Sequence, residues 1–109
     1  MAKIQVSWRD NADNEEGFKV YESTDATVNT GDSLIAEVTW NAGSSSWVAT
    51  GSATNLTLTS SNQSPSATGE IFTITFDNNT IGTYYYGVSA SNAVGDSAIA
   101  ASSVGVVVQ

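Results

Sequence analysis

Four carboxylates near the start of the chain form its densest group of potential metal ligands. They are Asp10, Asp13, Glu15 and Glu16. Calcium prefers oxygen ligands of this kind. The spacing differs from an EF-hand loop, because Ala12 stands where the third position needs an acidic or amide side chain. We therefore expect a solvated loop rich in turn formers and no bound metal, with calcium binding as the alternative.

A second group of candidates consists of aromatic residues that the predicted core does not need. Exposed tryptophan and tyrosine stack on sugar rings or anchor protein interfaces. Tyr21 and Tyr85 are expected to face outward on neighbouring strands beside Gly87, where Tyr21 can instead serve to cover the bare glycine. For Trp47, burial and exposure are both open. The candidate contact surface is Tyr21, Trp40, Trp47 and Tyr85.

Catalytic chemistry has little support in the residue types. The chain contains no cysteine and no histidine, which excludes disulfides, thiol nucleophiles and the commonest general base. Lys3 and Lys19 are expected at exposed strand positions, where neither is an activated base for a serine or threonine. No carboxylate spacing argues for glycoside hydrolysis. We predict that the protein is not an enzyme and uses no cofactor.

The charge balance argues against two further classes of function. Eleven acidic residues against three basic ones give a net charge of −8 over 109 residues. A surface of this sign repels phosphate backbones and anionic membranes, so we expect no nucleic-acid partner. No apolar run is long enough to span a bilayer, and the first residues lack the apolar run of a signal peptide. We therefore also expect no membrane insertion.

Alternating apolar residues predict β-strands along much of the chain. In residues 84–90, the tyrosine, valine and alanine at every second position share one face, which is the period of a half-buried strand. Residues 3–9 alternate in the same way and place Trp8 in the core. Further strands are expected at residues 18–21, 34–40 and 70–76, with a last strand carried by Ile99, Val104, Val106 and Val108.

Three of these segments together resemble a fibronectin type III domain. They read Val-Ser-Trp at residues 6–8, Glu-Gly-Phe-Lys-Val-Tyr at residues 16–21 and Gly-Thr-Tyr-Tyr-Tyr-Gly-Val-Ser-Ala-Ser-Asn-Ala-Val-Gly-Asp-Ser at residues 82–97. They match strands B, C and F and the turn after F, and their residues are similar to those of the bacterial and phage branch of the family. The resemblance implies a single immunoglobulin-like β-sandwich over residues 1–109, in which the hydroxyl of Tyr84 bonds nearby backbone.

The chain departs from the family pattern in two places. Residues 41–69 are an uncharged insertion between strands C′ and E. Within it, residues 46–50 and 55–59 flank a turn-like stretch and predict an inserted β-hairpin, with a polar loop as the alternative. The family's first strand, A, has no obvious counterpart. We therefore expect an open edge on strand B, filled in preference by the inserted hairpin and otherwise by a strand from a neighbouring protein.

The expected function is that of a non-enzymatic structural or binding module. An acidic, cysteine-free domain that resembles extracellular modules but has no export signal fits a phage virion, as a capsid-decorating, tail or fibre-associated protein. Its expected partners are a virion protein, another copy of itself or a cell-surface glycan. The alternative is a carbohydrate-associated accessory or linker module from a bacterial secreted enzyme or adhesin. Both hypotheses place the domain on a virion surface or outside a cell.

Overall fold

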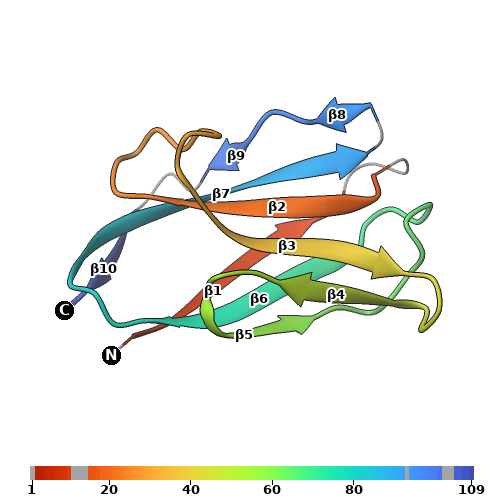
Figure 1. The fold of residues 1–109 in the computed structure, drawn as a ribbon, viewed down its shortest axis with the longest axis horizontal. Helices are drawn as coiled ribbons and strands as arrows, with labels where there is room; N and C mark the ends of the chain where they lie inside the picture. Colours follow the sequence, from red (N-terminus) through yellow and green to blue (C-terminus); the bar gives the residue numbers. More distant parts are fainter. Residues whose placement is uncertain (1, 11–14, 93, 102–104) are drawn as a thin grey trace.

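A computed structural model of the chain describes residues 2–10, 15–92, 94–101 and 105–109. These residues form two antiparallel β-sheets that pack against each other as a β-sandwich (Figure 1). The predicted all-β sandwich is therefore confirmed. Within the described ranges there is no helix of the length and apolarity needed to cross a membrane.

The smaller sheet contains three strands in the order β1-β6-β5. Strand β1 (Ala2–Arg9) pairs along its whole length with β6 (Ile71–Asn78), and β6 pairs on its other side with β5 (Thr54–Thr59). In β1, Ile4 is buried, and Val6 and Trp8 are half-buried against the core. The residues between them face solvent, so the alternation in the sequence predicts the inner face of this strand correctly.

The larger sheet follows the path β10-β7-β2-β3-β4. Its centre is β2 (Gly17–Ser23), which lies between β7 (Gly82–Asn92) and β3 (Ser33–Asn41). On β7 the inner face carries the predicted tyrosines and valine. The edges are formed by β4 (Ser46–Thr50) on one side and, on the other, by β8 (Gly95–Asp96), β9 (Ala100–Ala101) and β10 (Val106–Val108).

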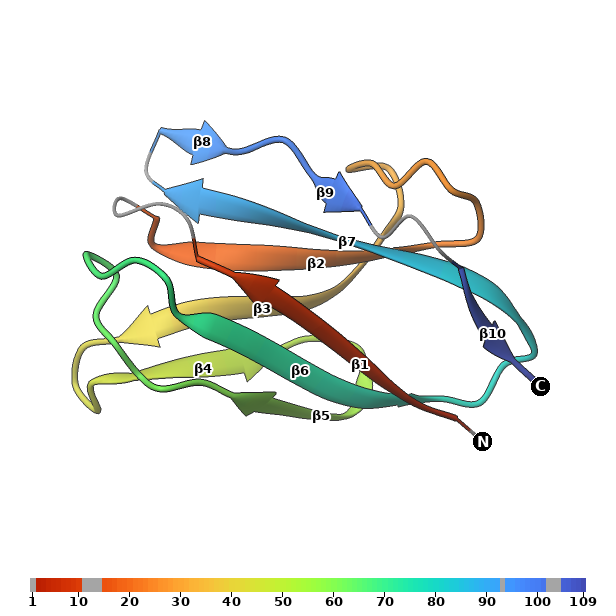
Figure 2. The same ribbon diagram turned by 180° about the vertical axis from the view of Figure 1, so that it is seen from behind.

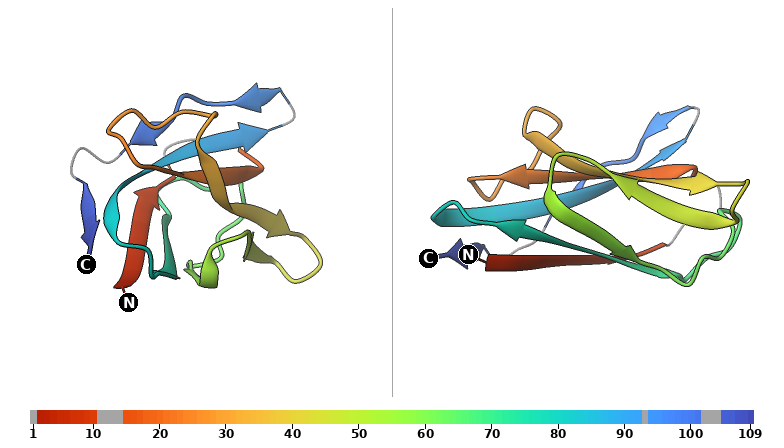
Figure 3. Two further views of the ribbon diagram at one scale, coloured as in Figure 1. Left: turned by 60° about the vertical axis from the view of Figure 1, so that its left-hand side comes forward. Right: turned by 60° about the horizontal axis from the view of Figure 1, so that its bottom comes forward.

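The single last strand predicted from the sequence is divided in the structure. Strand β9 pairs with the middle of β7, where Ala100 lies opposite Val88, whereas β10 pairs with the start of β7. Ile99 precedes β9 and belongs to no strand, and Val104 lies outside the described residues. Both ends of the described chain meet at the same end of the sandwich in every view (Figure 3).

The insertion supplies two strands, but these do not form the predicted hairpin. Strand β4 pairs with β3 in the larger sheet and β5 pairs with β6 in the smaller one. The physical reason is that each strand has one apolar face, and placing the two strands in different sheets turns both faces into the same interior. The chain crosses between the sheets at Gly51, where a Cβ atom would lie 2.2 Å from the carbonyl oxygen of Ile35.

The insertion also leaves the outer edge of β1 uncovered. Strand β5 lies at the opposite edge of the smaller sheet, with β6 between it and β1. The preferred prediction, that the insertion fills the edge of strand B, is therefore wrong. Residues 60–69, which follow β5, form a loop fixed by Glu70, whose buried carboxylate accepts hydrogen bonds from the Ser60 hydroxyl and from the backbone N–H of Gln63 (3.1 Å).

Aromatic rings from both sheets meet in the core. The Trp8 ring stacks on Phe72, with ring centroids 5.6 Å apart and an interplanar angle of 15°. Phe18 packs against the same phenylalanine at 4.8 Å. The Tyr84 hydroxyl donates a hydrogen bond to the backbone oxygen of Thr80 (3.1 Å), as expected for this tyrosine. The rings thus hold together strands that are distant in the sequence.

Candidate functional site

Trp47 and Trp40, two of the four aromatic candidates, lie side by side across β3 and β4. They are directly opposite in register, with ring centroids 5.4 Å apart. Trp47 is only 5% exposed, and its indole N–H donates a hydrogen bond to the backbone oxygen of Gln63 (2.8 Å). Its ring also packs edge-on against Phe72 of the other sheet at 5.1 Å. Trp47 is therefore a core residue, and half-buried Trp40 covers it.

The two tyrosine candidates differ in how far they are buried. Tyr21 lies opposite Gly87 in register but is 5% exposed, so it offers little contact surface. The space beside Gly87 is filled by Ile99 and Val28, because a Cβ atom there would come within 2.4 Å and 2.9 Å of their methyl carbons. Tyr85 remains half-buried. The four aromatics thus do not assemble into one exposed surface.

The acidic group in the first loop is described only in part. Asp13 lies outside the described residues, whereas Asp10 and Glu15 are buried and Glu16 is exposed. The backbone of Asp10 forms two hydrogen bonds, one to the oxygen of Glu70 (2.8 Å) and one from the N–H of Gly69 (2.7 Å). Among the residues that the structure places, no three carboxylates lie close enough together to hold a metal ion.

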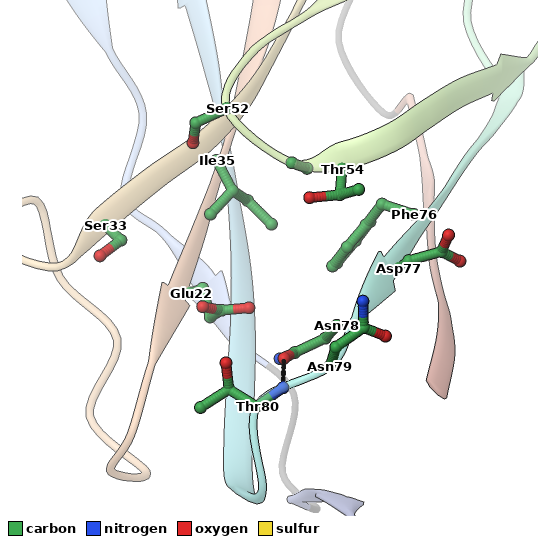
Figure 4. Close-up of a pocket in the computed structure, with 11 residues that line it drawn as sticks. Glu22, Ser33, Ile35, Ser52, Thr54, Phe76, Asp77, Asn78, Asn79 and Thr80 are labelled. Atoms are coloured by element: carbon green, nitrogen blue, oxygen red, sulfur yellow. Dashed lines mark hydrogen bonds between the residues drawn. The ribbon is translucent and has the colours of Figure 1, made fainter. Parts of the chain in front are cut away.

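A polar pocket that the sequence did not indicate lies between the two sheets (Figure 4). Its volume is about 360 Å³. One wall comes from the end of β2 and the start of β3, and the other from the end of β6 and the turn that follows it. The polar side chains that line it are Glu22, Ser33, Ser52, Thr54, Asp77, Asn78, Asn79 and Thr80.

Hydrogen bonds fix both carboxylates of this pocket. The Tyr86 hydroxyl donates to Glu22 Oε2 (2.8 Å), and burial together with this contact raises the pKa of Tyr86. The Asn55 amide donates to Asp77 Oδ2 (2.7 Å), and this bond, helped by Lys3 at 3.6 Å, lowers the pKa of Asp77. None of the lining residues is cationic, so the pocket suits a neutral ligand rich in hydroxyl groups.

The sequence carried only a faint signal for this pocket. The run from Asp77 to Thr80 has the composition of a turn, but its first two residues end β6 and only Asn79 and Thr80 follow the strand, with the Thr80 N–H bonded to Asn78 Oδ1 (3.0 Å). Glu22 is more than fifty residues away and looks like any solvent-facing strand residue. Only the packing of the two sheets brings these side chains together.

The fold and the pocket define an all-β sandwich with a polar surface site. No protein-family model, curated protein or solved structure matches the chain. The resemblance to fibronectin type III domains therefore rests on the residues of the chain.

Proposed function

We propose that this protein is a non-enzymatic structural and binding module of the fibronectin type III kind, exposed on a phage virion as a capsid-decorating, tail or fibre-associated protein. Strand order supports the immunoglobulin-like sandwich, the architecture that fibronectin type III domains share. The paths β1-β6-β5 and β10-β7-β2-β3-β4 correspond to strands B-E-D and G-F-C-C′-C″ of immunoglobulin-like domains. The hydrogen bond from Tyr84 to the backbone four residues earlier corresponds to the tyrosine corner of such domains.

The observation that carries the binding role is a pair of exposed apolar side chains at one end of the larger sheet. Ile81 is 80% exposed and Val107 is 60% exposed. Val107 lies opposite Thr83, two residues from Ile81, so both side chains belong to the same end of the β7–β10 ladder. Contact with a neighbouring subunit removes such side chains from water, and this favours association.

The virion assignment is tested by locating the gene and the protein. We expect the coding sequence to stand among capsid and tail genes, and the protein to be detected by mass spectrometry in particles purified by density. Ile81→Asp should reduce its incorporation into particles, whereas Ala42→Asp, at an exposed position in the turn after β3 at the opposite end of the larger sheet, should not. Absence of the wild-type protein from purified particles contradicts the proposal.

The polar pocket favours a second candidate, a carbohydrate-associated module. Its hydroxyl, amide and carboxylate lining can form hydrogen bonds with sugar hydroxyls. A glycan array with the wild-type protein and with Thr54→Val tests this function. Loss of binding in the variant supports a sugar in the pocket, and Thr59→Val, on an exposed part of the same strand, is the matched control. Absence of binding to any glycan removes this candidate.

A further inference from the structure

Strand β1 has one long edge that no described strand covers. Its inner partner β6 pairs with all eight of its residues, from Ala2 opposite Asn78 to Arg9 opposite Ile71. On the outer side, the described part of the chain provides no partner, and β1 forms the margin of the smaller sheet (Figure 2). Unpaired N–H and C=O groups along such an edge are a template for another strand.

A groove runs along this free edge. It consists of two adjoining hollows of about 420 Å³ and 280 Å³, which share Trp8, Val88 and Ala100 in their walls. The first continues beside Val6 and Val106. All five of these wall residues are apolar. Because alternate side chains of a strand point to the same face, a strand added to β1 would direct every second side chain into this groove.

A buried hydrogen-bond donor lies in the wall of the groove. The indole N–H of Trp8 is shielded from solvent and has no acceptor in the described structure. The ring cannot easily turn to find one, because it stacks on Phe72 and packs against Phe18 at 5.6 Å. An unpaired buried donor is costly, and its place in the wall of the groove makes the Trp8 indole N–H a sensitive reporter of a chain added beside β1.

The charges along β1 indicate the kind of chain that fits. Lys3 and Arg9, two of the three cations of the protein, lie near the ends of the strand, and uncharged Gln5 and Ser7 lie between them. Antiparallel pairing of two copies of β1 centred on Val6 would place Lys3 opposite Arg9, and like charges directly opposite each other destabilise a strand pair. An acidic partner segment instead gains from both cations.

We propose that the free edge of β1 and the adjoining groove accept an extended segment of a partner protein as a fourth strand of the smaller sheet. This segment carries acidic residues six positions apart, which face Lys3 and Arg9, and small apolar residues such as valine, which face the groove. The identity of the partner as a virion protein rests on the proposed function, whereas the acceptance of a strand does not.

The test is to add a synthetic peptide to the intact protein and to measure whether it pairs with β1. In this nine-residue probe, valine occupies the odd positions, threonine the fourth and sixth, and glutamate the second and eighth. Hydrogen exchange should show protection of those β1 amides that do not bond to β6. At 90% occupancy the exchange of these amides should slow about tenfold, because only the free fraction exchanges. In nitrogen–proton NMR spectra, the indole N–H signal of Trp8 should shift on binding.

Matched controls separate strand addition from non-specific attraction. A probe methylated on those alternate backbone nitrogens that face β1 cannot pair with the strand and should not bind. Arg9→Glu should weaken binding of the glutamate probe by about two- to fivefold, the range for an exposed ion pair, and should favour a probe with lysines in place of the glutamates. Lys19→Glu makes the same charge change on the other sheet and should have a much smaller effect.

Three results would overturn the proposal. The first is no protection of β1 at saturating probe, and the second is equal binding of the methylated probe. The third is protection of both edges of β1 without any probe, in a monomer or in a dimer, which would show that this chain covers the edge itself. If the protein is found in virions but β1 accepts no peptide, the proposed function stands and this inference fails. If β1 accepts the peptide but the protein is absent from virions, this inference stands and the proposed function fails.

Discussion

Replacing Trp47 with alanine removes the indole through which β4 packs against the smaller sheet. Three rings lose contacts, since Trp47 lies 5.8 Å from Phe18, 5.1 Å from Phe72 and 5.4 Å from Trp40. The change also removes the hydrogen bond from the indole N–H to the backbone oxygen of Gln63. The residue was a candidate for contact with a ligand, so this variant separates a core role from a surface role.

The expected loss of stability follows from these contacts. Truncation of a buried tryptophan to alanine costs about 3–5 kcal/mol, and the lost hydrogen bond accounts for about 0.5–1.5 kcal/mol of destabilisation on its own. A domain of this size has a free energy of unfolding of roughly 5–16 kcal/mol. The variant therefore loses a large fraction of its stability. With a urea slope of about 2 kcal/mol per molar, the unfolding midpoint should fall by about 2 M.

The assay is equilibrium unfolding in urea, followed by circular dichroism because the substitution changes tryptophan fluorescence. Trp47→Phe keeps a ring but loses the N–H donor, and should fall between the wild type and the alanine variant. Trp40→Ala is the matched control, since half-buried Trp40 covers the same site from outside and should cost less. An unchanged midpoint in Trp47→Ala would refute the assignment of this residue to the core.

Three further predictions concern pH and backbone packing. The raised pKa of Tyr86 favours its neutral form in the folded protein, so its contribution to the free energy of unfolding is complete below about pH 10 and is lost as pH rises further. Tyr86→Phe should therefore flatten the fall of the urea midpoint at alkaline pH. The lowered pKa of Asp77 has the opposite sign, so its contribution is present above about pH 4 and is lost in stronger acid, and Asp77→Asn should remove that part of the acid dependence. Gly51→Ala should destabilise by about 1–3 kcal/mol, because its new Cβ would clash with the backbone of Ile35, whereas Gly43→Ala on an exposed turn should change the urea midpoint little; equal effects of the two glycine substitutions would contradict this.

The strands with alternating apolar residues could be predicted because alternation is a local property. Residues 3–9 and 84–90 show which side chains face inward whatever their partners are. The same reasoning located β4 and β5 but could not choose their partners. An apolar face fits a hairpin and a pair of strands in different sheets equally well. The choice depends on contacts distant in sequence, such as Trp47 against Phe72, and on the crossing at Gly51.

The candidate contact residues show that residue type alone does not predict which aromatic side chains are exposed. Tyr21 and Trp47 are candidates because a simple two-sheet core does not need them, yet each is only 5% exposed in the structure. The polar pocket is the opposite case, because the structure brings together residues that the sequence does not indicate. Neither Glu22 nor Asp77 stands out in the sequence. Its side chains come from both sheets, so their proximity depends on how the sheets pack together.

The pairing of β1 with β6 also determines when the smaller sheet can form during synthesis. Arg9 pairs with Ile71 and Ala2 with Asn78, so 62 to 76 residues separate the partners along the chain. At about 5–20 residues per second, a ribosome needs roughly 3 to 15 seconds to synthesise that interval. Strand β1 thus emerges first and waits with both of its edges unpaired until β6 follows. Slower translation lengthens this interval and, with it, the time in which two nascent chains can associate through β1.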